Sequence, residues 1–152
     1  ERGLRGGTEN VIGIAGFGAA AKLVSNNLDR AGDIQALRDD LEARVKQIAP
    51  NSIVAGASVA RLPNTSCIIL PGVSSEAQVM ALDLAGVAVS AGAACSSGKI
   101  TPSHVLMAMG IPEELAGCAI RVSMGPETAA ADVDAFIDAW GKLAARANRT
   151  AA

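Results

Sequence analysis

Residues 53–72 read IVAGASVARLPNTSCIILPG, and this stretch decides the class of fold. It holds three short apolar runs of strand length, at 53–55, 59–62 and 66–70, with Pro-Asn and Pro-Gly pairs between or after them. Proline and glycine at such points favour tight turns, so these strands should follow one another directly. The stretch therefore predicts an antiparallel or mixed sheet of short strands.

Helical patterns flank this stretch on both sides. Before it, apolar residues recur at helical spacing over 33–48 with charges between them, and Pro50 ends that helix. Beyond it, Ser74 or Ser75, Pro102 and Thr128 stand where helices can begin. Helices are predicted at 10–24, 33–48, 74–84, 102–109 and from 128 onward, and further strands at 87–89 and 119–123. The order predicts an α+β fold over a single domain, 1–152, with helices covering one short mixed or antiparallel sheet.

Composition excludes several kinds of partner. The 152 residues carry a net charge of -2, and aromatic residues make up only 2% with no tyrosine. Binding to nucleic acid needs clustered basic residues or a stacking surface, so neither mode is expected. The longest apolar run, 11–21, is shorter than the roughly 20 residues that span a bilayer, and it ends at Lys22. We expect no membrane partner and a cytoplasmic location.

Three cysteines, Cys67, Cys95 and Cys118, are the candidate reactive groups. Their number is odd and no C-x-x-C pair occurs, so neither a disulfide framework nor a zinc site is indicated. Cys67 and Cys118 lie in apolar strand-like runs, where a thiol usually packs as a small hydrophobic group.

Cys95 differs because it lies in a loop of small and polar residues, SAGAACSSGKIT at 90–101. Glycines allow wide backbone excursions, and Lys99 and nearby hydroxyls could favour the reactive thiolate. From composition alone, a small buried residue in a tight turn is an equally good interpretation of Cys95.

A resemblance becomes specific at this loop. The segment VAVSAGAACSSGKITPSHVLMAMG at 87–110 resembles the catalytic-cysteine loop of group I cysteine desulfurases, a branch of the class V aminotransferases with the type I fold of pyridoxal-phosphate enzymes. ERGLRGGTEN at 1–10 is similar to that family's R-x-G-T segment, and IRVSMG at 120–125 to its R-x-S-x-G strand. RLPNT at 61–65 resembles its hairpin connection. The motifs occur in order along the whole chain.

The resemblance implies a role for three residues. Cys95 would be the thiol that takes sulfur from L-cysteine as a persulfide, releasing alanine, and then carries it to an acceptor or scaffold protein of iron–sulfur assembly or tRNA thiolation. Arg121 would bind the substrate carboxylate. An arginine in mid-strand is expected to be buried or half-buried and to need an anion as partner. An internal salt bridge to an Asp or Glu could also supply that anion. Thr8 would contact the phosphate of the partner subunit's pyridoxal phosphate, which implies a homodimer; it could equally cap the following helix.

The resemblance covers only the last two fifths or so of such an enzyme. Pyridoxal chemistry needs a Schiff-base lysine, and none of the four lysines (Lys22, Lys46, Lys99 and Lys142) has the family's His-Lys context. We therefore expect this chain to be the C-terminal small domain of a longer enzyme, with 1–24 linking it to the large domain. Alone it should be inactive.

Two other functions are compatible with these residues. The alternatives are a selenocysteine lyase or aminotransferase relative with a bystander cysteine, and a stand-alone persulfide carrier without pyridoxal phosphate.

GIAGFG at 13–18 has the wrong spacing for a dinucleotide fingerprint. His104, the only histidine, is expected to be solvated or to serve structure rather than to act as the base for Cys95.

Overall fold

The computed structural model of this chain describes residues 8–26, 28–92 and 102–150. Its elements are α1 (Val11–Asn26), η1 (Leu28–Arg30), α2 (Ala31–Ile48), β1 (Ile53–Val54), β2 (Thr65–Ile69), α3 (Ser75–Asp83), β3 (Ser90–Ala91), α4 (His104–Ala108), α5 (Glu113–Ala116), β4 (Ala119–Ser123) and α6 (Ala130–Thr150). The predicted mixture of helices and short strands is confirmed, and the helical elements that were not predicted are α5 and the short 3-10 helix η1.

The strands form a four-stranded sheet in the order β1-β2-β4-β3 within the described residues. Each neighbouring pair is antiparallel. In the longest pair Thr65 lies opposite Ser123 and Ile69 opposite Ala119, so β2 and β4 are matched along their whole length. This sheet confirms the antiparallel alternative of the sequence prediction.

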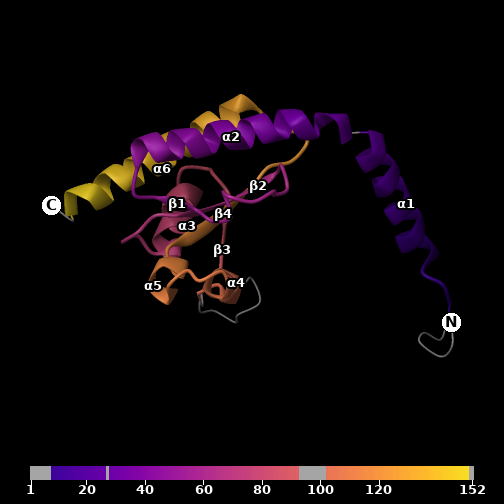
Figure 1. Cartoon of the computed structure of the whole chain (residues 1–152). Coiled ribbons are helices and arrows are strands. Elements are labelled where there is room, and N and C mark those ends of the chain that lie inside the picture. Colours follow the sequence, from indigo (N-terminus) through magenta and orange to yellow (C-terminus); the bar gives the residue numbers. More distant parts are fainter. Residues whose placement is uncertain (1–7, 27, 93–101, 151–152) are drawn as a thin grey trace.

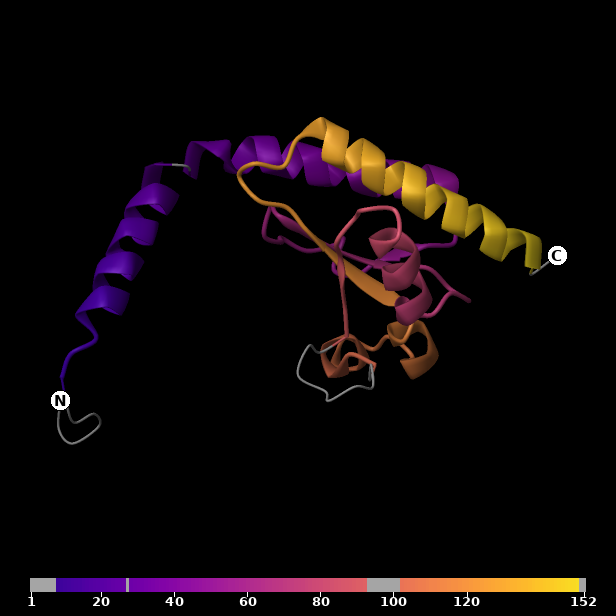
Figure 2. The same cartoon turned by 180° about the vertical axis from the view of Figure 1, so that it is seen from behind.

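Helices cover both faces of the sheet. The long helices α2 and α6 lie side by side across one face, while α4 and α5 lie beyond the other (Figures 1 and 2). Alternate residues of β2 and β4 divide between the faces, because successive side chains of a strand point in opposite directions. Ile68, Ile120 and Val122 join the core under α2 and α6. Ile69 and Ala119 join a smaller cluster with α4 and α5.

Helix α1 extends away from this body, as both views show (Figures 1 and 2). Asn10 caps it, since its Oδ1 accepts a hydrogen bond from Gly13 N at 3.0 Å. Its apolar side chains are largely exposed, with Ile12 at 88% and Phe17 at 78%. In the described part of the chain no single helix is long and apolar enough to cross a bilayer, although Val11–Ser25 and Leu28–Ile48, bent by 52°, pass that test as a pair.

Two strand predictions are wrong. Residues 59–62 form no strand, because Gly56 turns the chain with a φ of +74° and Arg61 is drawn to Glu42 of α2 by hydrogen bonds of 2.8 and 2.9 Å. Residues 87–89 also form no strand; pairing begins at Ser90, opposite Arg121.

Two predicted helix starts also shift. Ser103, not Pro102, caps α4, with its Oγ accepting from Leu106 N at 3.5 Å. Thr128 accepts a hydrogen bond from Gly125 N, and Asp132 instead accepts one from Ala129 N at the start of α6.

Candidate functional site

The candidate site begins with a row of side chains across three strands. Arg121, in the middle of β4, lies opposite Cys67 of β2 on one side and Ser90 of β3 on the other. Side chains directly opposite each other in an antiparallel sheet share a face, so all three face α4 and α5. Within this row Cys67 and Arg121 are especially close. Asn64 and Met124 continue the register of β2 and β4, and the hydrogen bond from Met124 N to Asn64 O makes them a hydrogen-bonded pair. Hydrogen-bonded and non-hydrogen-bonded pairs alternate along an antiparallel ladder, so Cys67 and Arg121 form a non-hydrogen-bonded pair. The Cα atoms of such a pair lie only about 4.5 Å apart.

A cavity of about 350 Å³ adjoins this row. Its wall on the helix side comes from Ser103, His104 and neighbouring residues of α4, and its floor from the strands. Cavities of this size commonly hold small ligands when a few polar groups converge on apolar walls. The cavity therefore brings together a guanidinium, a thiol, two hydroxyls and an imidazole from four separate segments.

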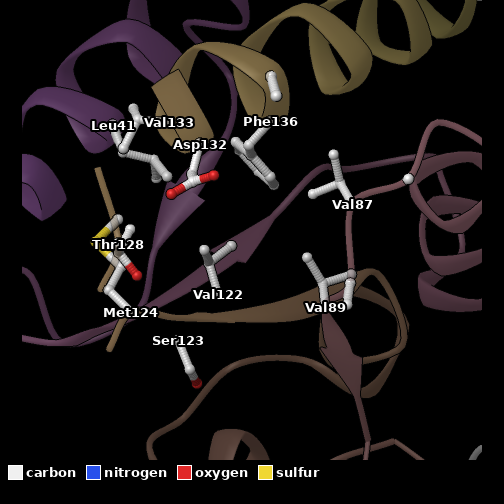
Figure 3. A pocket seen from close by; sticks show the side chains of 13 residues that line it. Leu41, Val87, Val89, Val122, Ser123, Met124, Thr128, Asp132, Val133 and Phe136 are labelled. Carbon is white, nitrogen blue, oxygen red and sulfur yellow. The ribbon is translucent and has the colours of Figure 1, made fainter. Parts of the chain in front are cut away.

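A second cavity, of about 210 Å³, lies on the opposite side of the sheet (Figure 3). Val87, Val89, Val122 and Phe136 give it apolar walls, and Asp132 adds a carboxylate to the lining. Its described lining contains neither a thiol nor a basic group, so it lacks the groups needed for thiol chemistry on an anionic substrate.

Arg121 is exposed, which corrects the expectation that it would be buried or half-buried. The physical reason is that its face of the sheet borders the cavity rather than the core under α2 and α6. Nor does the described part of the chain provide an ion pair for Arg121. The internal salt bridge considered for it is therefore not found there, and its guanidinium can accept an anion from outside.

The two described cysteines differ in surroundings. Cys118 is buried, and its thiol donates to Glu114 O at 3.4 Å, which agrees with its predicted packing role. Cys67 is only half-buried and lines the cavity. Burial raises the pKa of the Cys67 thiol, and the positive charge of Arg121 partly opposes this. Cys67 is thus a neutral thiol at neutral pH, and its position in the cavity was missed by the sequence prediction.

The predicted site residues are only partly brought together. Cys95 lies outside the described residues, but Gly92, which leads toward it from β3, lines the cavity with a φ of +60°. Thr8 is exposed and lies just before α1, the helix that extends away from the sheet (Figure 1). Thr8 and Arg121 therefore do not meet within one copy of this chain. His104 is exposed at the start of α4 and also lines the cavity, a position that its place in the sequence did not indicate.

Comparison with known proteins agrees with the motifs. The profile of the class V aminotransferases matches residues 1–136. The chain belongs to this family. A cysteine desulfurase of Cereibacter sphaeroides is 45% identical over 138 residues, covering 91% of this chain and 35% of that protein. The cysteine desulfurase NifS of Azotobacter vinelandii is 39% identical, covering 90% and 34%.

Solved structures show the same relationship. A NifS-like protein from Rickettsia africae superposes with a TM-score of 0.81 at 38% identity, over 92% of this chain and 36% of that one. The predicted fold class is confirmed by this match. This class V aminotransferase chain spans about a third of the length of the relatives it matches.

Membership of the class V aminotransferases implies pyridoxal phosphate in the intact enzyme. The described residues do not fit the whole cofactor, because they offer no suitable Schiff-base lysine. Lys46 donates to Ser52 O beside α2, and Lys22 and Lys142 are exposed on α1 and α6, so none lines the cavity at Arg121. A covalent cofactor site would have to include residues beyond the described ones.

Proposed function

We propose that this chain is part of a pyridoxal-phosphate-dependent cysteine desulfurase, in which Arg121 binds the carboxylate of L-cysteine and Cys95 accepts its sulfur. The observation that carries the proposal is the exposed guanidinium of Arg121, which forms no ion pair within the described residues, in a cavity whose lining includes Gly92, three residues before Cys95. A planar guanidinium binds carboxylates through paired hydrogen bonds, which would fix the orientation of a bound amino acid. The high similarity to cysteine desulfurases supports the choice of substrate.

The proposed reaction divides the work between cofactor and protein. Pyridoxal phosphate, when bound, acts as an electron sink. Arg121 anchors the carboxylate, and the Cys95 thiolate attacks the substrate sulfur. An S–S bond forms as the substrate C–S bond breaks, the substrate carbon gains a proton, and the products are alanine and a persulfide on Cys95. Cys95 then passes the sulfur to an acceptor protein.

The proposal includes a homodimer. Thr8 would contact the cofactor phosphate of the partner subunit. In support of this, Thr8 lies three residues before the start of α1, and α1 extends away from the sheet that carries Arg121 (Figure 1). Residues 1–24 would link this small domain to a large one, and the exposed apolar side chains of α1 support such packing. The cytoplasmic location stays a prediction.

The test uses the intact gene product, loaded with pyridoxal phosphate and given L-cysteine. Alanine is quantified, and the Cys95 peptide is weighed for the added mass of one sulfur atom. We expect alanine and a persulfide that disappears in Cys95→Ala but persists in the matched control Cys118→Ala, because Cys118 is buried away from the cavity.

Two outcomes would favour the alternatives. Equal alanine production by Cys95→Ala would refute Cys95 as acceptor and favour a lyase with a bystander cysteine. Sulfur uptake from a small persulfide donor, without pyridoxal absorbance and without alanine formation, would favour a stand-alone persulfide carrier.

A further inference from the structure

We propose that Cys67 is a positioning residue of a small-carboxylate subsite centred on Arg121, where its thiol fills the space beside the guanidinium and leaves that guanidinium to an external anion. The proposal adds a second thiol to the site, distinct in role from Cys95. It rests on the proposed function only for the statement that the bound carboxylate is that of the substrate.

The first argument is the distance between the two side chains. Cys67 and Arg121 form a non-hydrogen-bonded cross-strand pair, in which Cβ atoms are about 4.5–5.5 Å apart. Both side chains line the same cavity. Burial raises the pKa of the Cys67 thiol and the positive charge of Arg121 lowers it to a smaller extent, so the guanidinium is near the thiol. A carboxylate that the guanidinium holds would lie near the thiol too.

The second argument is the charge of the cavity. No Asp or Glu is among the described residues that line it, and Arg121 is the permanent charge there. Ser90 and Ser103 add hydroxyls, His104 adds an imidazole, and the remaining described lining is apolar. Such walls strengthen the attraction of a cation for an anion.

The third argument concerns what occupies position 67. A carboxylate side chain there would pair with Arg121 across the strands and compete with a ligand. The thiol does not compete, because burial keeps it neutral by raising its pKa. A small neutral side chain opposite Arg121 thus leaves the guanidinium free to bind an external carboxylate.

The test is selective alkylation of the chain with iodoacetate, an anion, and iodoacetamide, its neutral analogue. In both reactions the thiolate sulfur forms a bond to carbon and iodide leaves. Trypsin cleaves after Arg61 and Lys99, so Cys67 and Cys95 share a peptide. The label is therefore measured in the Cys95→Ala chain, where Cys67 is the only thiol of that peptide.

We expect the iodoacetate-to-iodoacetamide rate ratio at Cys67 to exceed that of glutathione by about tenfold, the effect of one charge-assisted contact. Arg121→Gln should remove the excess, and Arg121→Lys should keep part of it. L-alanine should slow the iodoacetate reaction at Cys67, whereas alaninamide, which has no carboxylate, should not.

The proposal is overturned if Cys67 shows the ratio of glutathione, or if alanine and alaninamide protect it equally. These measurements need no variant of Arg121, so a poorly folded variant does not prevent a decision. Cys118 is the matched control: it is buried outside the cavity, and it should stay unreactive and show no preference for iodoacetate while the chain is folded. If persulfide forms on Cys95 but Cys67 shows no preference for the anion, this inference fails and the proposed function stands. If instead Cys67 prefers iodoacetate but the intact enzyme forms no alanine from L-cysteine, this inference stands and the proposed function fails.

Discussion

Replacing Gln78 by methionine should strongly destabilise the domain. Gln78 is completely buried on α3; its Nε2 donates to Val73 O at 3.1 Å and to Cys118 O at 2.7 Å, and its Oε1 accepts from Trp140 Nε1 at 3.1 Å. Methionine has similar length but makes none of these bonds. Cys118 O keeps a bond from Leu70 N, whereas Trp140 Nε1 and Val73 O lose the partners described. At roughly 1–3 kcal/mol for each of these two unpaired buried groups, the loss is about 2–6 kcal/mol.

Urea unfolding followed by fluorescence of the single tryptophan, Trp140, measures this loss. Gln47→Met is the matched control, because Gln47 is exposed on α2 and the same change there should alter stability by no more than about 0.5 kcal/mol. A decrease below about 1 kcal/mol for Gln78→Met, with an unchanged denaturant slope, would refute the reasoning. The result also matters for the site, because Cys118 directly precedes β4, the strand that carries Arg121.

Two further predictions concern stability. Burial raises the pKa of Glu42, but hydrogen bonds from Arg61 and Ser66 and the charge of Arg61 outweigh it and lower that pKa. The stabilisation is therefore present above the unfolded carboxyl pKa of about 4.3 and is lost as pH falls through the lower folded pKa. Glu42→Gln should lower the free energy of unfolding by about 1–2 kcal/mol at pH 7 and flatten the acid limb of a stability–pH curve. An unchanged acid limb would contradict this. Gly86 has a φ of +78° and Gly32 lies in α2, and a Cβ on either meets no atom within 4 Å. Thermal melts should show Gly86→Ala destabilised by about 1–2 kcal/mol and Gly32→Ala unchanged or slightly more stable; equal effects would show that backbone conformation is not the cause.

The features predicted well from sequence are those fixed by neighbouring residues. The helix at 33–48 follows from apolar residues at helical spacing, and the structure has it at Ala31–Ile48. Ser74 caps α3 through a bond from Ala77 N, a contact that lies within one helical turn. The strand predicted at 119–123 has the same bounds in the structure. The order of the motifs likewise sufficed to indicate the family to which the chain belongs.

The errors arise where distant segments decide the outcome. Residues 59–62 are apolar enough for a strand, but the contact between Arg61 and Glu42, 19 residues apart, holds them against α2 instead. Cys67 packs against the smaller hydrophobic cluster, as predicted, but its place in the cavity lining could not be predicted because its apolar neighbours hide the alternation of β2. A run that is apolar on both faces of a sheet does not reveal which residues face a cavity.

The sequence by itself determined α1, α2, α3, α4 and α6 to within a few residues, the strand β4, the family and the three candidate residues Cys95, Arg121 and Thr8, since these depend on local spacing and on motifs. Only the tertiary structure decided that Cys67 and Ser90 flank Arg121, that Arg121 is exposed at a cavity, and that α1, which follows Thr8, extends away from the sheet. The physical reason is that strand register and the packing of α4 join residues that are tens of positions apart, and no local pattern records which of them will be neighbours.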